Sequence, residues 1–84
     1  MPTVSRFYGI AIKMFFAQWE HQPPYFHAIY GEYNALFAID SLEMIEGDLP
    51  NRAVQLVKEW GRRYKKELQT MWNTQEFSQL PGLE

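Results

Sequence analysis

The sequence predicts an α+β fold in which an antiparallel sheet of three or four strands packs on one long C-terminal helix, in the order β-β-β-β-α. Two observations carry this prediction. In the first half of the chain apolar residues alternate with others, which is the period of a half-buried strand. In the second half they recur every three or four residues, which is the period of an amphipathic helix. A helix that follows a run of strands typically covers one face of their sheet.

Length and composition favour one domain, residues 1–84. A chain of 84 residues is too short to divide its core in two. Its 17% aromatic content supplies large side chains that can anchor that core. Cysteine is absent, which excludes disulfides and thiolate chemistry. No apolar run approaches the roughly 20 residues that span a bilayer, so we expect no membrane association and a cytoplasmic location.

The first strand is expected over residues 6–16, where every second residue is apolar or aromatic from Tyr8 onward. Residues 1–5 contain a proline and small polar side chains, so we expect a loosely held lead-in. Residues 17–24 are predicted to form a loop. Two prolines close this loop and bias the chain that follows toward an extended strand.

A hairpin is predicted at Gly31-Glu32, because glycine at the first central position suits a two-residue type II′ turn. This turn pairs Tyr30 with Tyr33 and thereby sets the register of both strands. One face of the hairpin is then wholly apolar or aromatic, and it consists of Phe26, Ala28, Tyr30, Tyr33, Ala35, Phe37 and Ile39. We expect the mixed face to stay uncovered, and it consists of Tyr25, His27, Ile29, Asn34, Leu36 and Ala38.

A further strand is predicted after a second tight turn at Asp40-Ser41. This turn would place Met44 opposite Phe37 and extend the apolar face. The segment Glu46-Gly47-Asp48 is expected to end the strands and to begin the helix.

The helix is predicted from Asp48 to Asn73, with Asp48 as N-cap and Pro50 in the first turn. Its apolar stripe contains Ala53, Leu56, Val57, Trp60, Tyr64, Leu68, Met71 and Trp72. A straight helix of this length would span about 39 Å, whereas a small sheet measures roughly 20 Å. We therefore expect the helix to bend near Gly61, to wrap a sheet edge or to cover a second copy of the chain. Residues 75–84 are expected to fray.

The net charge of −2 is unevenly distributed, because acidic residues predominate in the first half and basic residues gather on the predicted helix. Basic and aromatic side chains together are typical of surfaces that hold single-stranded RNA. The residues concerned are Tyr25, Arg6, Lys13, Arg62, Arg63, Lys65 and Lys66. The alternative is an ordinary solvated helix face, which the sequence pI of about 5.6 favours.

Four segments of the chain carry a family resemblance: residues 1–10 (MPTVSRFYGI), residues 23–33 (PPYFHAIYGEY), residues 45–50 (IEGDLP) and Val57-x-x-Trp60. With these segments the chain resembles a family of small, mainly bacterial proteins called domain of unknown function 4160. The resemblance implies an α+β domain, a frequent genetic neighbour encoding another small domain, and a toxin–antitoxin-like module. Family members commonly have a histidine where this chain has Tyr25, so the histidine pair of the family is incomplete here.

His27 is the candidate catalytic residue, because an imidazole with a pKa of about 6.5 suits proton transfer at neutral pH. The alternative is a half-exposed strand position at which His27 hydrogen-bonds a neighbour. A metal site formed by His21, His27 and Glu20 has no recognisable ligand spacing. We therefore predict no metal site and no cofactor, and the sequence contains no phosphate-binding loop or nucleophile elbow.

The function that the sequence favours is a non-enzymatic protein-interaction module, one half of a two-protein regulatory pair. The mixed sheet face and the long helix stripe leave apolar surface that a partner would cover. This partner is either a small protein from a neighbouring gene or a second copy of the chain. The alternative is an RNA-binding or RNA-cleaving toxin-like protein that uses His27. The candidate binding residues are Tyr25, Ile29, Arg6, Arg62, Arg63 and Lys66.

Overall fold

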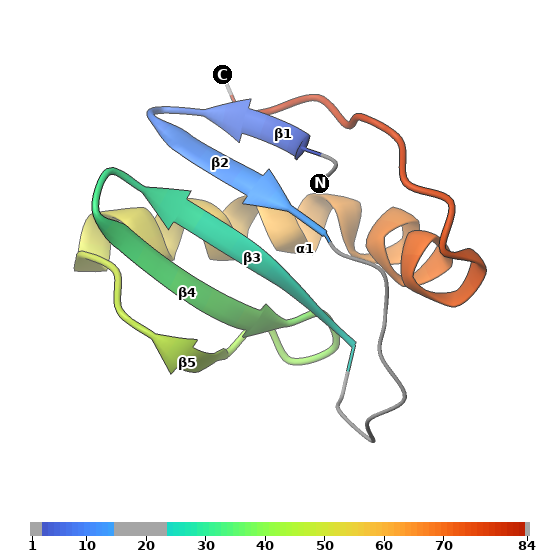
Figure 1. The fold of residues 1–84 in the computed structure, drawn as a ribbon, viewed down its shortest axis with the longest axis horizontal. Coiled ribbons are helices and arrows are strands. Elements are labelled where there is room, and N and C mark those ends of the chain that lie inside the picture. Colours follow the sequence, from blue (N-terminus) through green and yellow to red (C-terminus); the bar gives the residue numbers. More distant parts are fainter. Residues whose placement is uncertain (1–2, 15–23, 84) are drawn as a thin grey trace.

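A computed structural model of the chain describes residues 3–14 and 24–83. It has the predicted α+β architecture, an antiparallel sheet followed by one long C-terminal helix, with five strands in the sheet (Figure 1). The strands are β1 (Thr3–Phe7), β2 (Ile10–Lys13), β3 (Tyr25–Tyr30), β4 (Tyr33–Ala38) and β5 (Met44–Gly47), and the helix is α1 (Asn51–Thr74). The strands lie in the order β1-β2-β3-β4-β5, so β1 and β5 form the two edges of the sheet.

The additional strand arises because a turn divides the first predicted strand. Tyr8 and Gly9 have φ values of 49° and 80°, and two successive positive φ values are what a type I′ hairpin turn requires. The prediction of a loose lead-in is wrong for residues 3–5, which belong to β1 and place Val4 in the core. Residues 15–23, which include the end of the predicted first strand and most of the loop, lie outside the described residues.

The central hairpin has the predicted register. Tyr30 pairs with Tyr33, and the ladder continues without interruption to Tyr25 opposite Ala38. Gly31 has a φ of 59°, as the first central residue of a type II′ turn requires. A local turn therefore set the pairing of the two longest strands.

The connection from β4 to β5 is longer than the predicted two-residue turn. Met44 lies opposite Phe37 as expected. Leu42, however, has a φ of 60°, and its N–H donates to the Ala38 carbonyl at 2.9 Å. Leu42 is 6% exposed, so the wider turn carries an apolar side chain into the core.

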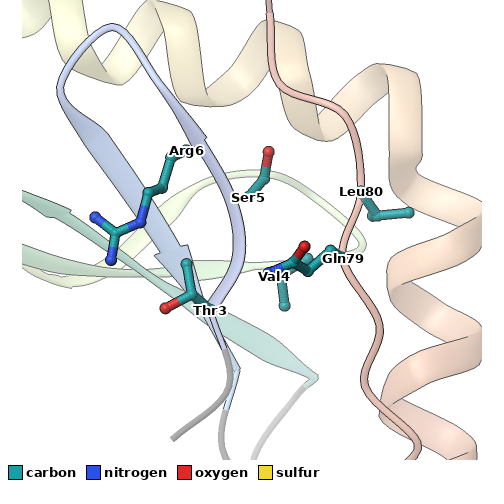
Figure 2. A pocket seen from close by; sticks show the side chains of 6 residues that line it. All are labelled: Thr3, Val4, Ser5, Arg6, Gln79 and Leu80. Atoms are coloured by element: carbon teal, nitrogen blue, oxygen red, sulfur yellow. The ribbon is translucent and has the colours of Figure 1, made fainter.

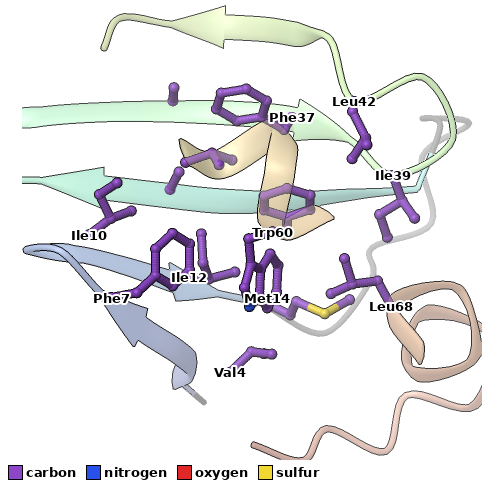
Figure 3. Close-up of a cluster of buried hydrophobic side chains, with 14 of the residues drawn as sticks. Val4, Phe7, Ile10, Ile12, Met14, Phe37, Ile39, Leu42, Trp60 and Leu68 are labelled. Atoms are coloured by element: carbon purple, nitrogen blue, oxygen red, sulfur yellow. The ribbon is translucent and has the colours of Figure 1, made fainter. Parts of the chain in front are cut away.

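The core lies between α1 and one face of the sheet (Figure 3). Trp60 of α1 is fully buried, stacks on Phe7 with ring centroids 5.6 Å apart and meets Phe26 edge-on at 5.9 Å. The largest fully buried side chains are Trp60, Phe26, Phe37, Ile10, Ile12, Met14, Ile39, Leu68, Val4 and Val57. The predicted apolar face of the hairpin is thus the core face, although Tyr30 and Tyr33 at its turn end are exposed.

The helix begins later than predicted, and it bends within one turn of Gly61, near which a bend was one of the expected outcomes. Asp48 is not its N-cap, because the Asp48 N–H still donates to the Asn34 carbonyl of β4 at 3.1 Å; Pro50 occupies the cap position. The backbone leaves helical geometry at Tyr64, where φ is −115° and ψ is 21°, and not at Gly61. Gly61 serves packing instead, since a Cβ there would lie 2.5 Å from Leu42 Cδ2.

The chain after α1 returns along β1 (Figures 1 and 2), and we call residues 75–83 the C-terminal segment. The Leu80 N–H donates to the Val4 carbonyl at 2.7 Å, and the Trp60 indole N–H donates to the Pro81 carbonyl at 2.9 Å. Leu83 is buried, and a Cβ on Gly82 would lie 2.5 Å from the Arg6 carbonyl oxygen. The predicted frayed tail is therefore an attached segment as far as residue 83.

Candidate functional site

One face of the sheet points away from α1, and we call it the open sheet face. Strand alternation and register bring together on it Arg6, Ala11, Lys13, Tyr25, His27, Ile29, Asn34, Leu36, Ala38 and Glu46. One row across it reads Lys13, His27, Leu36 and Glu46, from β2 to β5. Its basic residues thus come from β1 and β2, whereas its carboxylate lies on the β5 edge.

His27 lies in the middle of the open sheet face and is half-buried. Burial lowers its pKa below the ordinary value of 6.5, and a hydrogen bond with the Asn34 side chain offsets part of this effect. Its cross-strand partners are Lys13 and Leu36, so strand pairing brings no carboxylate directly opposite the imidazole. The arrangement favours a neutral imidazole at neutral pH, which can accept a proton.

Tyr25 packs against the end of the helix. Its ring centroid lies 5.0 Å from that of Trp72 and 5.7 Å from that of His27. Tyr25 therefore links the open sheet face to the last turns of α1, a contact that the sequence did not predict. Its ring contributes to the packing between β3 and α1.

The structure divides the predicted binding residues into two groups. Ile29 and Arg6 lie with Tyr25 and His27 on the open sheet face. Arg62, Arg63 and Lys66 are exposed on α1, which packs against the opposite face. The two basic groups therefore lie in different layers of the molecule and do not form one continuous patch.

Sequence reasoning missed the outer edge of β5, which we call the β5 edge. All four residues of β5 are exposed, including two large apolar side chains, Met44 at 39% and Ile45 at 50%. The exposed acidic residues Glu43, Glu46 and Asp48 lie within and beside this strand. Alternation within one strand does not reveal which strand ends a sheet, so the sequence offered no direct signal for it.

Residues 3–14 and 24–83 contain no group of three or more His, Cys, Asp or Glu side chains that could hold a metal ion. The proposed ligands His21 and Glu20 lie outside the described residues. Within the same ranges, no helix combines the length and the apolar character needed to cross a membrane.

Comparison with known proteins gives one family match. A family model described as "Domain of unknown function (DUF4160)" matches residues 9–73, which include the central hairpin, β5 and nearly all of α1. No curated protein and no solved structure gives a significant match.

Proposed function

The chain belongs to the family described as domain of unknown function DUF4160, and we propose that it is a bacterial, cytoplasmic, non-enzymatic protein-interaction module of a two-protein, toxin–antitoxin-like regulatory pair. The observation that carries this proposal is the β5 edge, a sheet edge with exposed Met44 and Ile45. An edge strand presents unpaired N–H and C=O groups to solvent, and proteins ordinarily shield such edges with a covering segment, a short or bulged strand, proline or charged side chains. β5 is short and acidic, and its pairing with β4 shifts register between Leu36 and Phe37, but no described residue covers it and it carries no lysine or proline.

The partner would add an extended strand to β5 as a sixth strand of the sheet. Main-chain hydrogen bonds supply affinity in this mode, and side chains at alternate positions supply specificity. Met44 and Ile45 provide the apolar contact. The carboxylates Glu43, Glu46 and Asp48 favour a partner strand that carries lysine or arginine. They also disfavour a second copy of β5, because two copies would bring like charges together.

Co-purification with the product of the neighbouring gene tests the proposal. The two proteins are expected to elute as one complex, and Ile45→Lys is expected to abolish it by placing a positive charge on the edge. Gln55→Lys is the matched control, because it adds the same charge at an exposed position on α1. The control is expected to leave the complex intact.

A growth assay of each gene alone and of both together tests the regulatory part of the proposal. We expect toxicity from one gene that its partner relieves, with relief lost in Ile45→Lys. A complex that survives Ile45→Lys would reject the β5 edge as its site. Growth arrest caused by this chain alone, and lost in His27→Ala, would instead favour an enzymatic toxin.

RNA binding or cleavage is the alternative function, and one arrangement favours it. Arg6 and Lys13 lie on the open sheet face, and Lys13 pairs directly with His27. In this case labelled RNA is retained at low salt and released as salt rises. The double variant Arg6→Gln/Lys13→Gln is expected to lose retention, whereas Arg62→Gln/Arg63→Gln on the other layer keeps it. Absence of retention from any RNA pool at low salt rejects this alternative.

A further inference from the structure

A cavity of about 420 Å³ lies between the two hairpin turns and the start of α1. We call it the tyrosine cavity, because Tyr8 and Tyr30 line it together with Arg52, Ala53 and Leu56 of the helix. Its volume falls within the range of roughly 300 to 1,000 Å³ that is typical of small-molecule sites. We propose that it binds a small planar aromatic ligand that carries an anionic group.

The Tyr30 ring forms a wall that is in place before any ligand arrives. A Cβ on Gly9 would lie 3.2 Å from Tyr30 Cε1, so the glycine lets the ring lie close against the neighbouring turn. On β4, Tyr33 stacks with Tyr30 at a centroid distance of 6.5 Å and an interplanar angle of 16°. A side chain that is already held by its neighbours loses little conformational freedom when a ligand binds.

Tyr8 is an unusual residue for the turn that it occupies. Its φ of 49° lies in the left-handed region, where asparagine or glycine is the favoured first residue of a type I′ turn. Its side chain is 54% exposed, so burial of the ring does not compensate for this strained backbone. Strained residues cluster at functional sites. Tyr8 can supply a second aromatic ring to a flat ligand, whereas asparagine or glycine cannot.

The charge of the cavity favours an anion. Arg52 is exposed at its rim, and the described residues that line it include no carboxylate. The first turn of α1 has no acidic residue, and no side chain caps its N–H groups. Arginine and these N–H groups both attract negative charge. The buried side chains Ile10 and Ala53 supply an apolar floor for the ring.

Chemical-shift titration of the isotope-labelled chain tests this proposal. Adenosine monophosphate and indole-3-acetate are the two probes, because they present a ring with a phosphate and a ring with a carboxylate. Adenosine and glucose 6-phosphate are the controls, which lack the anion and the aromatic ring. At least one probe is expected to shift the amides of Tyr8, Gly9, Tyr30 and Arg52, and to bind about tenfold more tightly than either control. The probe that binds identifies the anion as a phosphate or a carboxylate.

Two variants separate binding from stability. Tyr8→Asn is expected to raise the melting temperature, because asparagine relieves the strained turn, and to weaken binding of the probe about fivefold. Arg52→Gln is expected to reduce affinity to that of the uncharged control, while Lys58→Gln on the same helix leaves affinity unchanged.

Three outcomes would overturn the proposal. These are the absence of shifts at millimolar concentrations of both probes, shifts confined to other parts of the chain, and equal affinity of the unmodified chain and Tyr8→Asn. The outcome is independent of the partner assay, because Tyr8 and Arg52 do not belong to the β5 edge.

Discussion

β1 and β5 are both edge strands, yet the C-terminal segment lies along β1 whereas no described residue lies along the outside of β5. Beside β1, Gln79 and Leu80 flank the strand, with a cavity of about 380 Å³ between them and Thr3, Val4, Ser5 and Arg6 (Figure 2). The β5 edge presents Met44 and Ile45 to solvent instead. Both edge strands present backbone N–H and C=O groups that no further strand pairs, and the chain covers only one of the two edges.

The edge at β1 is linked to the core by side-chain contacts, and the β5 edge is not. Trp60 packs on Phe7 and also donates its indole N–H to the Pro81 carbonyl, so one residue joins core, β1 and C-terminal segment. β5 has four residues, all exposed, and pairs with β4 alone. Segments with few buried contacts open at low free energy. We therefore expect β5 to exchange its amide hydrogens faster than β1.

The largest expected effect comes from a substitution that disrupts the pairing of β5 with β4. Gly47 has a φ of 92°, and a Cβ there would overlap the Asn34 carbonyl oxygen and lie 2.7 Å from Ala35 Cα. Gly47→Ala is expected to lower the free energy of unfolding by about 3 kcal/mol, measured by urea denaturation. Gly31→Ala is the control, since its φ is 59° but no described atom lies within 4 Å of an added Cβ; about 1 kcal/mol is expected. Equal losses would contradict a collision at β5.

The second prediction applies the same truncation to both edges. Leu83→Ala removes a side chain that is 9% exposed and is expected to cost about 2 kcal/mol of unfolding free energy. Ile45→Ala removes a side chain that is 50% exposed and should cost less than about 0.5 kcal/mol. Thermal or urea unfolding of the pair measures the difference. A cost at Ile45 equal to that at Leu83 would mean that the β5 edge is covered.

The third prediction releases the covering segment from β1. Trp60→Phe keeps an aromatic ring in the core but removes the N–H that bonds the Pro81 carbonyl. It is expected to cost about 1 to 2 kcal/mol and to speed hydrogen exchange of the Leu80 amide more than that of the Ala28 amide. Trp72→Phe is the control, because the Trp72 ring packs on Tyr25, whereas the bond to the Pro81 carbonyl comes from the indole of Trp60. Unchanged exchange at Leu80 would show that the indole does not hold this segment.

The smallest expected effect concerns the open sheet face between the edges. Burial lowers the pKa of His27, so the folded chain takes up a proton less readily than the unfolded chain. The contribution of neutral His27 to the free energy of unfolding is therefore complete above a pH of about 6.5. It declines as the pH falls from there toward the pKa of His27 in the folded chain, which is lower. Unfolding of the unmodified chain and of His27→Gln at about pH 7.5 and about pH 5.5 measures it. The variant should lose less stability on acidification; an equal loss would contradict the burial effect.

The same histidine distinguishes two ways of binding a partner. A strand added at the β5 edge leaves His27 two strands away, so its pKa is expected to stay unchanged in the complex. A partner that covers the open sheet face would bury the imidazole further and lower its pKa again. Titration of the His27 resonances with and without the partner separates the two.

Local patterns predicted most of the fold. The Gly31-Glu32 turn set the full register from Tyr30 opposite Tyr33 to Tyr25 opposite Ala38, because a two-residue turn leaves one pairing possible. It also placed His27 and Ile29 on the open sheet face. The β1–β2 turn escaped prediction because Tyr8-Gly9 is an atypical type I′ pair. Asp48 was mistaken for a helix cap because its bond to β4 is invisible in the sequence.

Short-range and long-range interactions thus determine different features of this protein. Turn geometry and hydrophobic period act over a few residues, and they sufficed for the sheet, the helix and the core face of each strand. Whether each edge of the sheet is covered depends on contacts between residues that are distant in the sequence, such as Leu80 with Val4 and Trp60 with Pro81. The tyrosine cavity likewise exists only where two turns meet the start of α1. Tertiary packing therefore decided which edge is covered and which surfaces remain for binding, because both depend on segments far apart in the chain.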